Sequence, residues 1–255
     1  MIIGVSSTVF SENNLEESLE SVSKEFSHWE IFSEAEHDLN KVYRRLLAVK
    51  DSYSGMTFSV HSPISETNLA GLSERMREAS VLEIIATMER MAELDMNTLT
   101  VHPGTASFSI KNQEDKALLQ AKKSMRTLDR ASAEFGITVA VENMPSLSFM
   151  LGREASQLQE IITDTDLGVC FDIGHANTTG QMDSMIELLG RRIVNVHIHD
   201  NNGDRDSHMT IGEGSIDFHS VLSKLRGYSG RYIIESKGLE SAVVSKSRLE
   251  LLTGL

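Results

Sequence analysis

Residues 114–142 read EDKALLQAKKSMRTLDRASAEFGITVAVE, and this stretch contains one complete structural unit. Apolar residues recur at three- and four-residue spacing in Glu114–Phe135, which predicts an amphipathic helix. The run Ile137–Val141 is short, apolar and rich in β-branched residues, which predicts a buried strand. Glu142 follows that run directly. The stretch therefore predicts a helix that leads into a strand with a carboxylate at its end.

Similar strand-like runs recur along the chain, with helix-like stretches between most of them. The predicted strands are Ile2–Val5, His28–Phe32, Met56–Val60, Thr98–Val101, Ile137–Val141, Gly168–Phe171, Ile193–Val196 and Arg231–Ile234. The other predicted helices are Leu72–Leu94, Ala155–Thr163, Met182–Leu189 and Asp217–Leu225. Alternating strands and helices indicate a parallel sheet, and eight such units in 255 residues are typical of a closed barrel. A doubly wound open sheet is the alternative, but no glycine-rich phosphate fingerprint follows the first run. We predict one α/β domain over residues 1–255, a single (β/α)8 TIM barrel.

Composition and charge restrict the class of protein further. The net charge of −13 argues against a protein that binds mainly by wrapping phosphate backbone, although bound divalent cations would offset part of that charge. No segment is long and apolar enough to span a membrane, and the first ten residues lack the features of a signal peptide. The single cysteine, Cys170, lies in an apolar run, which predicts a buried thiol in a reducing, cytoplasmic location.

Six of the eight predicted strands are followed by a residue type that binds metals or transfers protons. These residues are His61, His102, Glu142, Asp172, His197 and Glu235. A single carboxylate at a strand end is usually a helix cap or a solvated residue. In a closed barrel, however, all six ends converge on one mouth, where catalytic groups lie. Three converging carboxylates repel one another, and a divalent cation relieves that repulsion. We therefore predict a metal centre at the C-terminal mouth.

Two loop motifs add further ligand types. In Asp172-Ile173-Gly174-His175, a histidine follows three residues after the carboxylate, at the start of the predicted loop. The segment 197–214 is one polar loop that contains Asp206 and His208, two residues apart, so an extended backbone points both the same way. Because this loop follows a strand that already ends in a ligand type, we interpret it as part of the mouth.

The ordered motifs resemble the xylose isomerase-like barrels, a superfamily of sugar and sugar-phosphate isomerases and epimerases that also includes endonuclease IV. The resemblance covers nearly the whole chain. It rests on HSP (61–63), HPG (102–104), VENMP (141–145), FDIGHAN (171–177), VHIHDNNG (196–203), DSHMTIGEGSIDF (206–218) and Glu235.

The resemblance implies a central metal held by Glu142, Asp172, His197 and Glu235. In the epimerase-like members, Glu142 and Glu235 also form the acid/base pair, and the metal lowers the cost of an enediolate. In endonuclease IV, three zinc ions are bound. The resemblance then implies one ion on His61, His102 and Glu142, a second on the central set, and a third on His175, Asp206 and His208.

Two enzymatic hypotheses follow from the resemblance. The first is a divalent-metal-dependent isomerase or epimerase acting on a small sugar or sugar phosphate. The second is an apurinic-site nuclease with three zinc ions, and only this one has DNA as a partner. Ile64 stands where the DNA-repair members usually carry an aromatic residue, and the loop over residues 200–206 lacks their longer insertion.

Three carboxylates with one histidine suit manganese, magnesium or cobalt, whereas additional histidines favour zinc. The third hypothesis is a metal-stabilised barrel that acts as a binding module without catalysis. The sequence defines no oligomeric state.

Some polar residues near the predicted mouth have two interpretations each. The second predicted strand is followed by Glu34, Glu36 and His37. These residues either face the mouth as substrate contacts or form a surface cluster at the start of a helix. His199 alternates with His197 and is expected to support the ligands rather than to bind metal. Arg205 binds a substrate phosphate or pairs with a neighbouring aspartate. Trp29 is expected in the core.

Overall fold

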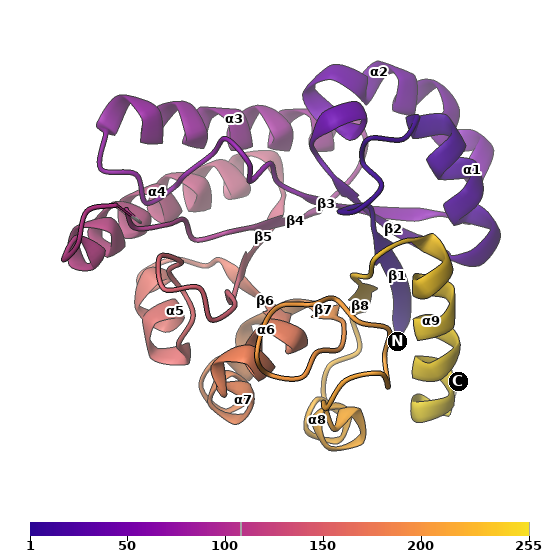
Figure 1. The fold of residues 1–255 in the computed structure, drawn as a ribbon. Helices are drawn as coiled ribbons and strands as arrows, with labels where there is room; N and C mark the ends of the chain where they lie inside the picture. The colour runs from indigo at the N-terminus through magenta and orange to yellow at the C-terminus, as the bar shows by residue number, and fades with distance from the viewer. Residues whose placement is uncertain (108, 255) are drawn as a thin grey trace.

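Eight parallel strands close into a barrel in a computed structural model that describes residues 1–107 and 109–254 (Figure 1). Each strand pairs with the next in the chain, and the first pairs with the eighth. The strands are β1 Ile2–Ser6, β2 His28–Phe32, β3 Thr57–His61, β4 Thr98–Val101, β5 Thr138–Glu142, β6 Gly168–Asp172, β7 Ile193–Ile198 and β8 Arg231–Ile234. The predicted (β/α)8 barrel is confirmed, and each predicted strand lies within two residues of its observed bounds.

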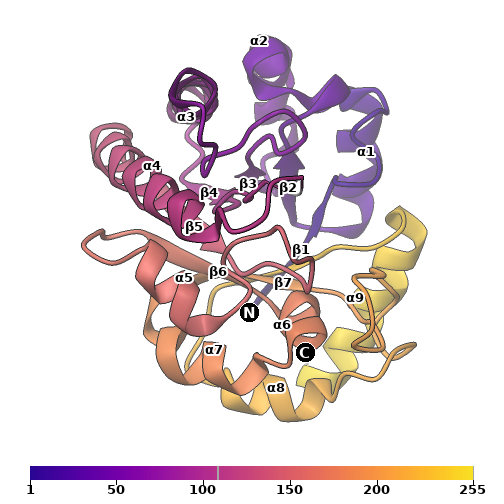
Figure 2. The ribbon, with the colours of Figure 1, turned by 60° about the vertical axis from the view of Figure 1, so that its left-hand side comes forward.

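Helices surround the barrel in chain order, as two views of the ribbon show (Figures 1 and 2). They are α1 Leu15–Glu25, α2 Leu39–Lys50, α3 Glu74–Glu93, α4 Glu114–Phe135, α5 Ala155–Ile161, α6 Ile173–Thr179, α7 Met182–Leu189, α8 Phe218–Lys224 and α9 Leu239–Thr253. Short 3-10 turns cover Ala35–His37, Asp51–Tyr53 and Gly190–Arg192. The predicted bounds of α4 and α7 match the structure.

The apolar core lies between the barrel and the helices, whereas the barrel interior is unusually polar. In β2, Trp29 and Ile31 belong to the core, as expected for the tryptophan. Glu30, between them, hydrogen-bonds across the barrel interior to Asn195 and His197 of β7. Successive strand residues point to opposite faces, so this alternation separates the apolar outer side from the polar interior. Barrel interiors usually hold bulky aliphatic residues. The polar side chains inside this barrel contact the residues at its mouth, as Glu30 contacts His197.

One sequence prediction about local structure was wrong. His175 was expected at the start of a loop, but it lies within helix α6. The carboxylate of Asp172 caps this helix by accepting a hydrogen bond from the backbone N–H of His175, and Gly180 ends the helix in a left-handed conformation. A helix of seven residues is too short to show a clear apolar period. Its position directly after β6 holds His175 more firmly than a loop would.

Two further expectations concern the cysteine and the membrane. Cys170 is fully buried in β6, and burial raises the pKa of its thiol above the usual range. In the described part of the chain, no helix combines the length and the hydrophobicity that crossing a bilayer requires.

Candidate metal centre

The closed barrel brings the six predicted strand-end residues to one mouth. His61, Glu142 and Asp172 are the last residues of β3, β5 and β6. His197 lies in β7, and the remaining two, His102 and Glu235, directly follow β4 and β8. Five of the six are buried, and the side chain of His102 is 22% exposed. Parallel pairing alone aligns these ends, because neighbouring strands run in the same direction.

The innermost group combines three carboxylates with one imidazole. Nδ1 of His197 lies 3.2 Å from Oε1 of Glu142, 3.5 Å from Oε1 of Glu235 and 3.9 Å from Oδ2 of Asp172. Asp172 and His197 are register partners on adjacent strands. One donor atom from each of the four residues lies within 4.8 Å of the others. We call Glu142, Asp172, His197 and Glu235 the inner cluster.

A second group shares Glu142 with the inner cluster. Oε2 of Glu142 lies 3.3 Å from Nε2 of His61 and 3.1 Å from Nε2 of His102. The other oxygen of the same carboxylate, Oε1, faces His197. Glu142 is therefore placed to bridge two ligand sets with its two oxygens.

A third group lies beside the inner cluster and joins α6 to the long loop after β7. Nε2 of His175 and Nε2 of His208 lie 3.2 and 3.1 Å from Oδ2 of Asp206. Nε2 of His199 lies 3.3 Å from Oδ1 of the same carboxylate. We call His175, His199, Asp206 and His208 the outer cluster. The nine residues predicted from the sequence thus fall into three adjacent groups, and His199 is added to the third.

Charges and hydrogen bonds within the clusters keep Glu142, His175 and His208 ionised against the effect of burial. Burial tends to raise the pKa of Glu142, but the charge of His197 and hydrogen bonds from His102, His197 and His61 outweigh it and lower the pKa. Burial tends to lower the pKa of His175, but Asp172 and Asp206 raise it to about 10. The pKa of His208 rises to about 8 against the effect of burial, because Asp206, Glu235 and Asp172 stabilise its cation. The protein alone therefore balances its buried carboxylates with protons on imidazoles.

The donor set fits a divalent metal. Within the inner and outer clusters, three buried polar atoms lack any hydrogen-bond partner among the described residues, namely Oδ2 of Asp172, Nε2 of His199 and Oδ1 of Asp206. Leaving such an atom unsatisfied costs about 1–3 kcal/mol, so buried polar atoms are normally paired. All three point into clusters of carboxylate oxygens and imidazole nitrogens, which are ligands for zinc, manganese and related ions. A bound cation would satisfy these atoms and would replace the imidazole protons.

Glu30 is a buried residue of the site that sequence reasoning missed. Oε1 of Glu30 lies 2.7 Å from Nε2 of His197. Its other oxygen accepts hydrogen bonds from Ser59 and Asn195. A carboxylate that accepts the proton of one imidazole nitrogen leaves the other nitrogen free for a metal. The signal in the sequence was a glutamate between two core residues of a strand, Trp29 and Ile31.

We expect Glu30→Gln to weaken metal binding by about 10- to 100-fold, because the neutral amide fixes the His197 tautomer less strongly. Competition with a coloured chelator measures the affinity. Glu78→Gln on the exposed surface of α3 is the matched control, and its affinity is expected to stay unchanged. An affinity in Glu30→Gln equal to that of the control would show that Glu30 does not orient His197.

Asp200 organises the loop that carries Asp206 and His208. Its buried carboxylate accepts hydrogen bonds from the backbone N–H groups of residues 201, 212, 214 and 216. The backbone of Asp200 also pairs in both directions with Met209. A Cβ atom at Gly214 would lie 2.3 Å from Oδ1 of Asp200, so the turn requires glycine there. One carboxylate thus closes the loop over the mouth.

Other polar residues from the sequence analysis lie outside the clusters. The carboxylate of Glu34 binds the backbone of Ile64 and Ser65, which ties two mouth loops together. His37 is buried against Trp29, with ring centroids 5.3 Å apart. Arg205 is exposed on the loop.

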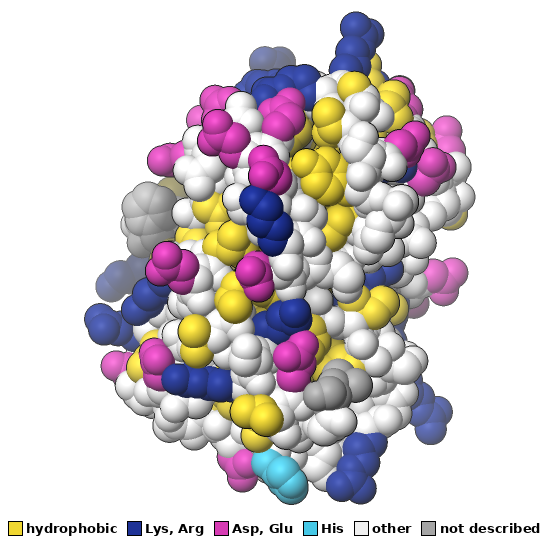
Figure 3. All heavy atoms as spheres, turned by 90° about the vertical axis from the view of Figure 1, so that its right-hand side faces the viewer, with side chains coloured by type: hydrophobic (Ala, Val, Ile, Leu, Met, Phe, Trp, Pro, Cys, Tyr) yellow, Lys and Arg dark blue, Asp and Glu magenta, His cyan; other side chains and the backbone are white. Residues whose placement is uncertain are grey.

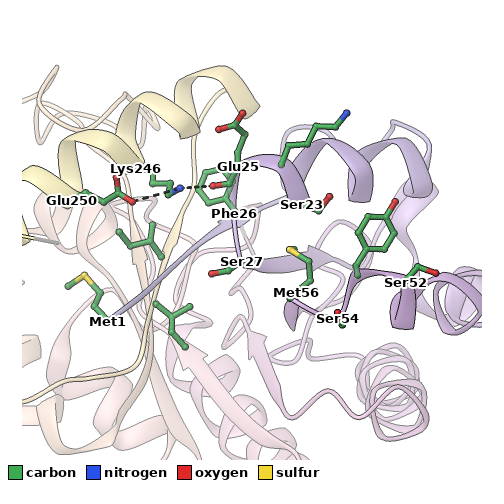
Figure 4. A pocket seen from close by; sticks show the side chains of 15 residues that line it. Met1, Ser23, Glu25, Phe26, Ser27, Ser52, Ser54, Met56, Lys246 and Glu250 are labelled. Carbon is green, nitrogen blue, oxygen red and sulfur yellow. Dashed lines mark hydrogen bonds and ion pairs between the residues drawn. The ribbon is translucent and has the colours of Figure 1, made fainter.

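A hollow of about 710 Å³ lies at the opposite end of the barrel (Figure 4). Met1, Ser27 and Met56, which line it, precede the strands β1, β2 and β3. Lys246 at its rim already binds the backbone oxygen of Glu25 and pairs with Glu250 at 3.8 Å. The clusters of metal-binding residue types lie at the other face, where catalytic groups of such barrels lie.

The chain belongs to the xylose isomerase-like TIM barrel family, whose sequence model matches residues 23–252. It is 38% identical over 260 residues to the uncharacterized protein MJ1311 of Methanocaldococcus jannaschii, covering 98% of this chain and 88% of that protein. A crystal structure described as a D-tagatose 3-epimerase-like protein superposes with a TM-score of 0.93 at 37% identity, covering 100% of this chain and 97% of that one. The probable endonuclease 4 of Mycobacterium bovis is 27% identical over 188 residues, 69% of this chain and 71% of the relative.

Proposed function

We propose that the protein is a divalent-metal-dependent isomerase or epimerase that acts on a small sugar or sugar phosphate. The observation that carries the proposal is the pairing of Glu142 and Glu235, whose carboxylates approach Nδ1 of His197 at 3.2 and 3.5 Å. Two carboxylates beside one metal position can act as base and acid on a substrate held between them. The inner cluster has the ligand types for such a metal.

The metal would be held by the inner cluster and would polarise the substrate carbonyl, which lowers the pKa of the adjacent C–H bond. One of Glu142 and Glu235 removes the proton from that carbon, and the C–H electron pair moves into the carbonyl group. The other carboxyl group then returns a proton to the carbon from its own side. Return on the opposite face inverts the carbon, whereas return to the neighbouring carbon, with the hydroxyl proton passing to the former carbonyl oxygen, interconverts ketose and aldose. The hydrogen bond between Nε2 of His197 and Glu30 would hold the imidazole in its orientation.

The likeness to the D-tagatose 3-epimerase-like protein supports sugar chemistry, because it extends over all of this chain at 37% identity. The negative net charge also suits a small substrate better than a nucleic acid backbone. The face turned to the viewer in Figure 3 mixes acidic and basic side chains and carries no continuous basic surface.

An apurinic-site nuclease is the second candidate function, and one observation favours it. All nine residues of the three-zinc pattern have counterparts here, and they lie in three adjacent groups of donor atoms. A multi-metal site suits phosphodiester hydrolysis, because it can activate water and stabilise the leaving oxygen. The likeness to the probable endonuclease 4 of Mycobacterium bovis supports this alternative.

Two assays distinguish the candidate functions. Both use protein reconstituted with manganese, cobalt, zinc or magnesium. Ketoses and ketose phosphates are incubated in heavy water, and proton NMR detects exchange at the carbon beside the carbonyl. A duplex with one abasic site is tested in parallel for nicking. We expect exchange and epimer formation with at least one sugar. Nicking that a chelator abolishes, without any exchange, would replace the epimerase proposal with the nuclease.

A further inference from the structure

The outer cluster contains one more ligand atom than the family resemblance implies. We propose that His199 is a fourth metal ligand there, and that His175, His199, His208 and Asp206 form a closed zinc site with a structural role. This inference deepens the proposed metal centre and rests on the same metal-dependent interpretation of the barrel mouth. It adds a second kind of site beside the inner cluster.

The first argument is the orientation of the imidazole rings. Nδ1 of His175 lies 2.9 Å from the backbone oxygen of Asn143, and Nδ1 of His199 lies 3.5 Å from that of Asp200. Each backbone oxygen can only accept, so each Nδ1 carries a proton, and Nε2 is the atom left to bind a metal once it has released any proton of its own. Both Nε2 atoms face Asp206. Metal-binding histidines usually donate their second nitrogen to a carbonyl or carboxylate in this way.

The second argument is the unsatisfied state of His199. Its side chain is completely buried, and Nε2 has no hydrogen-bond partner within residues 1–107 and 109–254. Nε2 lies 3.3 Å from an oxygen of Asp172 and 3.3 Å from an oxygen of Asp206, without hydrogen-bond geometry to either. Oδ1 of Asp206 is unsatisfied as well. One cation between these atoms satisfies both the nitrogen and the oxygen.

The third argument is the space made for the ring. A Cβ atom at Gly174 would lie 2.0 Å from Cε1 of His199, so only glycine at this position of α6 admits the imidazole. The ring also stacks on His208, with centroids 4.0 Å apart and planes inclined by 9°. A face-to-face stack is not the preferred arrangement of two aromatic rings. Both Nε2 atoms face the carboxylate of Asp206, and the two rings would tilt out of this stack to bring one ion into the plane of each imidazole.

The composition of the outer cluster defines its role. Three imidazoles and one carboxylate complete the tetrahedral shell that zinc prefers in structural sites, which leaves no position for a substrate. The inner cluster instead has three carboxylates and one imidazole, a set that suits manganese or magnesium. The outer metal would fasten the loop carrying Asp206 and His208 to α6 and to the end of β7. The inner metal would remain available to the substrate.

Cobalt substitution tests the proposal without any assay of turnover. Tetrahedral cobalt(II) absorbs visible light strongly, whereas the carboxylate-rich inner cluster favours higher coordination with weak absorption. Apoprotein is titrated with cobalt chloride in four forms: wild type, His199→Asn, His208→Ala and His219→Ala. His219 is an exposed histidine of α8 and serves as the control. Circular dichroism checks that each variant is folded.

We expect one strongly absorbing cobalt per chain in the wild type and in His219→Ala. Both cluster variants are expected to lose that absorption and to bind the corresponding zinc at least about 100-fold more weakly. Loss in His208→Ala together with an unchanged spectrum in His199→Asn would overturn the proposal. Nitrogen-15 NMR of the wild type is the second measurement, because Nε2 of His199 must shift when zinc binds, and an unmoved resonance also overturns it. Neither measurement depends on the sugar assays. A failure of the proposed zinc site can therefore be told apart from a failure of the proposed sugar chemistry.

Discussion

Glu142→Gln is expected to reduce kcat for the proposed sugar epimerisation by about 10³-fold while the barrel stays folded. Glu142 contributes one oxygen to the inner cluster and the other to His61 and His102. The amide cannot transfer the proton, and it replaces a negative ligand by a neutral one. The first effect raises the barrier of the chemical step, and the second weakens metal binding.

The measurement is single-turnover kinetics at saturating metal, which separates the lost proton transfer from weaker metal binding. Glu187→Gln changes an exposed glutamate of α7 and serves as the matched control, with activity equal to the wild type. Circular dichroism and the unfolding temperature establish that the variant is folded. Activity of Glu142→Gln within about threefold of the wild type would exclude Glu142 as an acid or base.

Removal of bound metal is expected to lower the free energy of unfolding by about 4 kcal/mol at pH 8, for a metal present at about 1,000 times its Kd. The clusters bring at least four buried or half-buried carboxylates together, and without metal only protonated histidines neutralise them. Metal binding competes with those protons, because ligating imidazoles must be neutral. The stabilisation by metal should therefore grow as the pH rises above 6.

The stability of the metal-free chain is expected to fall as the pH rises above 6.5, whereas the stabilisation by metal grows. The folded-state pKa values of His175 and His208 are raised from 6.5 to about 10 and about 8. Their stabilisation is complete below pH 6.5 and is lost as the pH rises through those values. The lowered pKa values of Glu142 and Asp172 act at the other end, and their stabilisation is lost as the pH falls below about 4. The metal-free chain should be most stable between about pH 4.5 and 6.5.

Calorimetric unfolding with and without a chelator, from pH 5 to 9, measures both effects. We expect the two stability curves to lie close together near pH 5 and to separate steadily toward pH 8. For His208 alone, the shift from 6.5 to about 8 corresponds to about 2 kcal/mol. Parallel curves over the whole range would contradict the view that metal and protons compete for the same imidazoles.

The sequence by itself determined the barrel and the ring of residues at its mouth. Apolar runs such as Thr98–Val101 and Ile193–Val196 specify strands through local patterning, and eight of them with intervening helices favour one closed architecture. Once the strands are parallel, residues that end them must meet, whatever their distance along the chain. The convergence of His61, Glu142 and His197 on one mouth therefore follows from the sequence.

The tertiary structure decided which of these residues share a group and what supports them. Glu30 and His197 are 167 residues apart, and only the closure of the barrel brings their side chains to 2.7 Å. The position of His199 depends on the glycine of a neighbouring helix, Gly174, which no local pattern of β7 encodes. Periodicity reports which face of an element is apolar, because burial repeats along one segment. Contacts between segments depend on register, helix placement and loop closure, and these are set by the packing of the whole barrel.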